Sequence, residues 1–222
     1  MKKKRIYKNP DPSKYIIVRT KEGDVLRRKR TNPSINDAFK EMAKETCSAA
    51  AKQILTRLKP FTEKMGGRVN VYLSGKMRSA KKQTGSYNYS LLPGFELQKD
   101  YPLEKLYEGQ YRVRKAGQTV YIDIPVCKGC TRAHNTLVTH YYFEAIAVFG
   151  DAMIPNSLRV EDDKSPLFDF GKTDKTTLSF SFVLPPGTPY LIWLKAGCME
   201  GDEAACHPMH YGMRVVAVGS GF

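Results

Sequence analysis

The sequence lacks any long apolar segment. No stretch approaches the roughly 20 consecutive apolar residues of a membrane-spanning helix, so we expect no membrane span. The basic residues 1–5 are followed by further charged residues up to position 30, where a secretory signal would have an apolar segment. We therefore predict a cytoplasmic protein or a component of a virion.

Motifs for catalysis are also lacking. There is no glycine-rich phosphate-binding loop, and the four histidines form no HExxH pattern. The acidic run Glu161-Asp-Asp163 lacks the glycine spacing of a calcium loop. His140 and Glu144 are explained as residues on the solvated face of a strand. We predict that the protein is not an enzyme.

Positive charge is abundant and unevenly distributed. The 222 residues include 36 Lys and Arg against 22 Asp and Glu, a formal net charge of +14. Residues 1–82 hold 23 of the basic residues and 7 acidic ones, whereas residues 83–222 hold 13 and 15. A charge asymmetry of this size indicates two parts with different roles, a basic front and a near-neutral body.

The basic front changes character along its length. Residues 1–31 have little periodicity and are predicted to be a basic arm, with a possible two-stranded ribbon over 15–19 and 24–27. Ser34 can cap a helix that continues at three- and four-residue spacing until Pro60 kinks or ends it. A second helix is predicted from residue 68 to about residue 80. A strand remains the alternative there, because Val69, Val71 and Leu73 alternate.

From Tyr111 onward the apolar pattern has a period of two, which is typical of strands. Val120 to Val126 show it most clearly. Seven strands are predicted, over residues 111–114, 120–126, 137–149, 157–160, 178–184, 190–195 and 213–218. We therefore predict an α+β protein with a basic arm at 1–31, a helical region at 32–92 and an immunoglobulin-like or fibronectin-like β-sandwich at 93–222.

The segment Leu184-Pro-Pro-Gly-Thr-Pro-Tyr190-Leu-Ile-Trp-Leu-Lys-Ala196 carries a resemblance. It resembles the corner before the sixth strand of fibronectin type III domains, which implies that the Tyr190 hydroxyl turns back to the chain near Leu184. An ordinary Pro-Gly turn before a strand is the alternative. The sequence departs from the family in having no tryptophan near residue 120 and a long loop from 150 to 175.

A second resemblance covers more of the chain. Residues 94–106, GFELQKDYPLEKL, and residues 120–125, VYIDIP, resemble an uncharacterised protein family of the Bacteroidetes. That resemblance implies a basic helical front before a sandwich, and it implies no activity.

The basic residues and the cysteines are the candidate binding sites. Arg27, Arg28, Lys29 and Arg30 form the densest basic patch, and Lys81 and Lys82 end the basic front. Such clusters bind nucleic acid or another polyanion by neutralising phosphates, although lysines on an amphipathic helix can equally be its solvated face. A second hypothesis is a subunit of a larger assembly, such as a phage or mobile-element structure, whose sandwich contacts other proteins.

Four of the five cysteines are predicted to lie in two loops at one end of the sandwich. Cys127 and Cys130 form a CxxC motif, Cys198 and Cys206 follow later, and His207 or His210 could substitute for one of them. This donor set suits a closed structural zinc site. Unligated thiols or a disulfide are the alternatives, because the second pair is not a CxxC.

Overall fold

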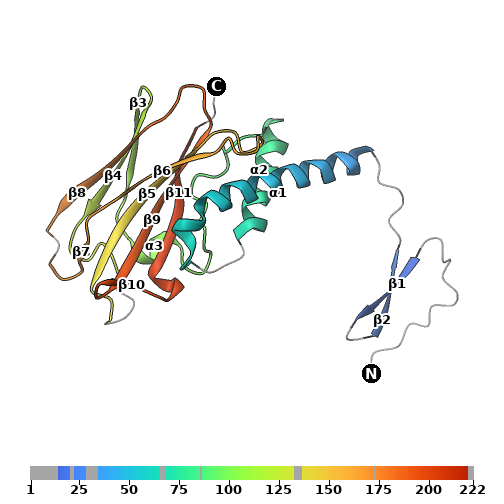
Figure 1. Ribbon diagram of the computed structural model, residues 1–222. Coiled ribbons are helices and arrows are strands. Elements are labelled where there is room, and N and C mark those ends of the chain that lie inside the picture. The colour runs from blue at the N-terminus through green and yellow to red at the C-terminus, as the bar shows by residue number, and fades with distance from the viewer. Residues whose placement is uncertain are drawn as a thin grey trace. The chain divides into compact units, whose positions relative to one another are not determined.

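The computed structural model describes residues 15–20, 23–28, 35–65, 69–85, 87–132, 137–172 and 174–219, and it divides into two compact units, Met1–Ala43 and Lys44–Phe222 (Figure 1). In the first unit, β1 (Tyr15–Thr20) and β2 (Gly23–Arg28) form an antiparallel hairpin. The predicted two-stranded ribbon is thus confirmed. A hairpin of two strands alone is marginally stable in water.

The second unit contains an antiparallel β-sandwich, so the predicted α+β class is confirmed. One sheet has the order β3-β4-β8, and its strands are β3 (Arg112–Ala116), β4 (Thr119–Val126) and β8 (Thr176–Val183). The other sheet has the order β6-β5-β9-β11, and its strands are β5 (His140–Phe149), β6 (Arg159–Lys164), β9 (Tyr190–Glu200) and β11 (Tyr211–Gly219). The shorter elements are α3 (Leu103–Leu106), β7 (Phe168–Asp169), β10 (Glu203–Ala204) and a 3-10 turn at Pro208–His210.

The apolar residues that alternate along β4 form part of the core between the two sheets. They are fully buried, and they are Val120, Ile122, Ile124 and Val126. The residues between them are partly exposed. The second sheet contributes Phe143 and Ile192 to the same core. The predicted alternation is therefore confirmed for this strand, whose other face meets solvent.

The outer face of the second sheet is covered by the second half of α1 (Ile35–Thr62) and by α2 (Val69–Thr84), as Figure 1 shows. Ile54 and Leu58 of α1 and Met77 of α2 pack in one core with Trp193 and Val215 of the sheet. The central strands β5 and β9 of the second sheet are thus buried on both faces. Residues 44–62 of α1, the helix α2 and the sandwich belong to one compact unit, which contains the boundary predicted between residues 92 and 93.

Both predicted helices are present in the structure. Residues 69–84 are helical, so the alternative of a strand there is wrong. Pro60 is accommodated inside α1, which ends two residues later at Thr62. The cap predicted at Ser34 lies outside the described residues.

The segment that follows α2 covers one sheet edge. Gly94 N–H donates to Val215 O at 2.8 Å, Val215 N–H donates to Phe95 O at 2.9 Å, and Leu97 N–H donates to Met213 O at 2.8 Å. The ring of Phe95 also stands edge-on against Trp193, with 6.1 Å between ring centroids. These contacts attach the segment to β11 and to the helix-covered face of the sheet.

The corner before β9 differs from the predicted tyrosine corner. Among the described residues, the structure records no hydrogen bond of the Tyr190 hydroxyl. The ring instead lies over Gly219 of β11, where an added Cβ would be 2.0 Å from a ring carbon. Packing against a glycine therefore holds this tyrosine.

Candidate functional site

The outer surface of the helix layer is strongly basic. Residues 44–84 contain ten Lys and Arg residues and two Glu residues. Eight of the ten have described side chains, all exposed or partly exposed, and they are Lys52, Arg57, Lys59, Lys64, Lys76, Arg78, Lys81 and Lys82. None of these eight forms an ion pair with a carboxylate in the described part of the chain.

Helical periodicity places these side chains outward. In α1 the buried positions Ile54 and Leu58 face the sheet, which leaves Lys52 and Lys59 toward solvent. In α2 the buried positions Leu73, Met77 and Ala80 have the same effect on Lys76 and Lys82. The apolar spacing that attaches the helices to the sheet therefore also displays the positive charge on a rigid support.

Two basic residues of α2 lie near Cys47 of α1. Burial raises the pKa of the Cys47 thiol, and the nearby positive charges of Lys81 and Arg78 partly oppose that rise. Both residues belong to α2, whereas Cys47 belongs to α1. The C-terminal half of α2 thus places positive charge beside α1. Lys81 and Lys82 lie in the last turn of α2, where their positive charge also stabilises the negative end of the helix dipole. This structural role is compatible with binding of an anion.

The structure describes only part of the predicted basic patch. Lys81 and Lys82 lie in the last turn of α2. Arg27 and Arg28 lie on β2, in the other compact unit, and their side chains are not described. Lys29 and Arg30 lie outside the described residues.

Several exposed lysines of the helices are not among the site residues predicted from the sequence. Lys52, Lys59 and Lys76 occupy the non-apolar positions of helices that the sequence already predicted. The helical spacing together with the number of basic residues would have indicated that these lysines form a basic surface.

The cysteines are placed differently from the prediction. Cys198 is a buried residue of β9 rather than a loop residue. Burial raises the pKa of its thiol to about 12. Cys127 and Cys130 share a turn after β4, in which Cys127 N–H donates to Cys130 Sγ at 3.0 Å, and Cys206 is exposed.

The structure does not gather these thiols into a recognisable metal site. In the described ranges no three His, Cys, Asp or Glu side chains are arranged to hold a metal ion. Zinc ligation by Cys127, Cys130, Cys198 and Cys206 stays a prediction, which elemental analysis of reduced protein purified without chelators would test.

Glu144 is another difference from the sequence interpretation. The sequence predicts that it lies on a solvated strand face, but Glu144 is buried and forms an ion pair with Lys195 of the neighbouring strand. The helix layer and its loops cover this sheet face, which sequence periodicity alone did not indicate.

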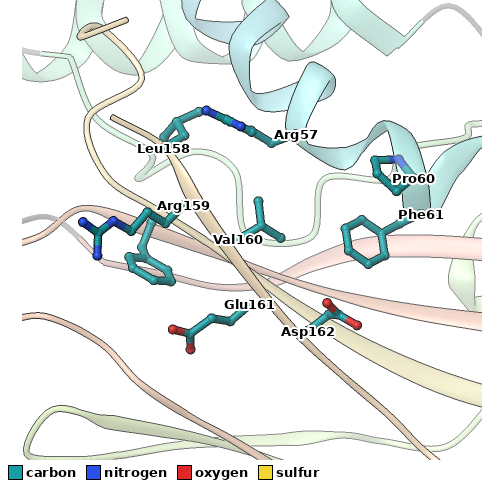
Figure 2. A pocket seen from close by; sticks show the side chains of 9 residues that line it. Arg57, Pro60, Phe61, Leu158, Arg159, Val160, Glu161 and Asp162 are labelled. Atoms are coloured by element: carbon teal, nitrogen blue, oxygen red, sulfur yellow. The ribbon is translucent and has the colours of Figure 1, made fainter. Parts of the chain in front are cut away.

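A pocket of about 590 Å³ lies between the end of α1 and β6 (Figure 2). Arg57, Pro60 and Phe61 line it from α1, and residues 158–162 line it from the other side. Val160 contributes an apolar wall, whereas Glu161 and Asp162 bring negative charge. Arg57 and Arg159 offset these two carboxylates, so the pocket lining has no net positive charge and marks a limit of the basic surface.

Comparisons with known proteins give no family. No family model matches the chain, and no curated protein matches it. Among solved structures, the chain is similar to the solution structure of R. palustris CsgH, with 8% sequence identity and a TM-score of 0.24. The match covers 46% of this chain and 91% of that chain. This likeness is too low to support any argument. None of the described helices is long and apolar enough to cross a membrane.

Proposed function

We propose that the protein is a non-enzymatic binding protein whose basic helix layer and N-terminal unit contact nucleic acid. The observation that carries the proposal is the row of exposed Lys and Arg residues on α1 and α2 without carboxylate partners in the described chain. The helices are attached to the sandwich by a shared core, so their charges are presented on a stable surface.

Binding of this kind derives its free energy from the release of counterions from the phosphates. The logarithm of the affinity falls linearly with the logarithm of the salt concentration, with a slope of about −0.9 per phosphate contact on duplex DNA. The helices lie against the sheet and leave lysine side chains rather than a recognition motif exposed. The proposed binding is therefore directed to the phosphate backbone and independent of base sequence.

The test compares two variants with the same change in charge. One replaces Lys52, Lys59, Lys76 and Lys82 of the helix layer by glutamine. The other replaces Lys105, Lys115, Lys128 and Lys175, which are exposed on the sandwich and its loops. Fluorescence anisotropy with a random-sequence duplex would measure affinity over a range of salt concentrations.

We expect the helix variant to lose affinity and to flatten the salt dependence by about 0.9 for each lysine that contacts a phosphate. The sandwich variant should retain the wild-type slope. Equal losses in both variants would indicate attraction by net charge alone, and an absence of binding by the wild-type protein would refute the proposal.

We also propose that the sandwich is of the fibronectin type III kind. The strand orders β3-β4-β8 and β6-β5-β9-β11 support this assignment, because β6 joins the sheet of β5 rather than that of β8, unlike the fourth strand of immunoglobulin constant domains. Membership of the uncharacterised Bacteroidetes family, and a role as a phage or mobile-element subunit, stay predictions.

A further inference from the structure

The lateral edges of the two sheets are protected to different degrees. An unprotected edge strand offers free backbone N–H and C=O groups to another chain, and proteins commonly block such edges with charged residues, proline, bulges or a covering segment. The edge at β11 is covered by residues 94–97, through the hydrogen bonds to Met213 and Val215 described above. That edge is therefore occupied within the chain.

Two further edges carry charges. On β6 five of the six residues are charged and exposed, and they are Arg159, Glu161, Asp162, Asp163 and Lys164. On β3 three of the five residues are basic and exposed, and they are Arg112, Arg114 and Lys115. A second copy of either strand would place like charges opposite or diagonal to one another, which disfavours pairing.

The edge at β8 has none of these protections. Thr176–Val183, TTLSFSFV, contains no charged residue and no proline. All eight residues pair with β4 in a continuous register, so no bulge twists the strand away. Within the described residues, the backbone of β8 has no hydrogen-bonding partner other than β4. Its last residue, Val183, is 66% exposed.

We propose that β8 is a dimerisation edge that pairs antiparallel with β8 of a second copy of this chain. The two three-stranded sheets then join into one continuous sheet across a twofold axis. A twofold contact uses the same strand from both copies, so it satisfies the free backbone groups of both edges at once. The lack of charge in β8 is the feature that permits self-pairing here and not at β3 or β6.

The residues of β8 suit such a contact on the solvent face of the sheet. In a register centred on Phe180, Ser179 is opposite Ser181 of the other copy, and Thr177 is opposite Val183. The Ser179 hydroxyl donates to Asp123 Oδ1 at 2.7 Å and can still accept from Ser181 of the other copy, and hydroxyl pairs are favourable cross-strand neighbours. The buried side of β8, with Phe180 and Phe182, stays in the core of its own sandwich.

The experiment measures the mass of the full-length protein by sedimentation velocity, after nuclease treatment and at high salt. We expect a concentration-dependent species of twice the mass of one chain. Ser181→Lys should give a monomer, because it places two lysines near the twofold axis. Ser90→Lys adds the same charge at an exposed loop position and should leave the dimer intact.

A charge reversal separates pairing from simple damage to the fold. Ser181→Glu alone should also be monomeric, whereas an equimolar mixture of Ser181→Lys and Ser181→Glu should recover the dimer. A wild-type protein that stays monomeric at high concentration would overturn the proposal. A dimer that persists in Ser181→Lys, or a mixture that fails to recover it, would do so as well. These outcomes are independent of nucleic-acid binding.

Discussion

Lys195 Nζ lies 2.7 Å from Glu144 Oε2, and the two residues are direct partners across β9 and β5. The side chains are 9% and 11% exposed. The rings of Tyr142 and Tyr211 lie 5.7 and 5.9 Å from the ammonium group. The pair is thus a cation and an anion kept largely from water beneath two aromatic rings.

Removing one charge of this pair should lower the free energy of unfolding more than replacing both charges by apolar side chains. Lys195→Met leaves the Glu144 carboxylate buried without its partner, so we expect a loss of about 3–5 kcal/mol in the free energy of unfolding. Adding Glu144→Leu removes the orphaned charge and should recover much of that loss. Urea denaturation, with comparison of m-values, measures the free energy of unfolding of the single and the double variant. Losses that simply add would show that the two charges do not depend on each other.

Cys198 should remain neutral in the folded protein over a wide pH range. Burial raises its pKa from the ordinary 9.0 to about 12, so its contribution to stability is complete below pH 9 and is lost as the pH rises from 9 toward 12. Between pH 9 and 12 the free energy of unfolding should therefore fall less in Cys198→Ala than in the wild-type protein. Thiol labelling at pH 8 should modify exposed Cys206 well before Cys198. Rapid labelling of Cys198 in the folded state would contradict the expected protection.

Two glycines should respond to alanine in opposite directions. At Gly212 an added Cβ would be 2.7 Å from the backbone Cα of Leu103, which cannot move aside as a side-chain end could. We expect Gly212→Ala to destabilise the protein by about 1–3 kcal/mol. At Gly75, within α2, the nearest atom would be 4.0 Å away, so Gly75→Ala should stabilise it by up to about 1 kcal/mol. Thermal unfolding of both variants checks the contrast.

Removal of residues 1–31 should weaken polyanion binding without unfolding the second unit. The deleted segment contains twelve basic and three acidic residues. The unit formed by residues 44–222 retains both of its cores. Circular dichroism should report an unchanged melting transition, while the salt dependence of duplex binding becomes shallower. Equal affinity and slope in the shortened protein would exclude a role of the arm.

The sequence predicted best those elements that have one solvated face. In β4 the alternation from Val120 to Val126 was legible because only one side is buried. In β9 residues from Tyr190 to Cys198 are all buried, since the helices cover the side that the sandwich leaves open. Periodicity cannot indicate burial from both sides, and so the helix layer's position was not predicted.

The candidate site was predictable to a similar extent. Net charge and helical spacing indicated a basic helical surface, and Lys81 and Lys82 lie on it. The partner of Glu144 is 51 residues away, so no local pattern could have found it. The burial of Cys198 likewise depends on tertiary packing, and the loop position predicted for it was wrong.

Trp193 is the single tryptophan of the chain, and it lies in the core between the sheet and the helices. Its fluorescence therefore reports on the water exposure of that core and not on the core between the two sheets. The protein has a built-in optical reporter at one of its two interfaces. Comparison of tryptophan emission with the circular dichroism of the whole chain would reveal whether the helices detach before the sandwich opens.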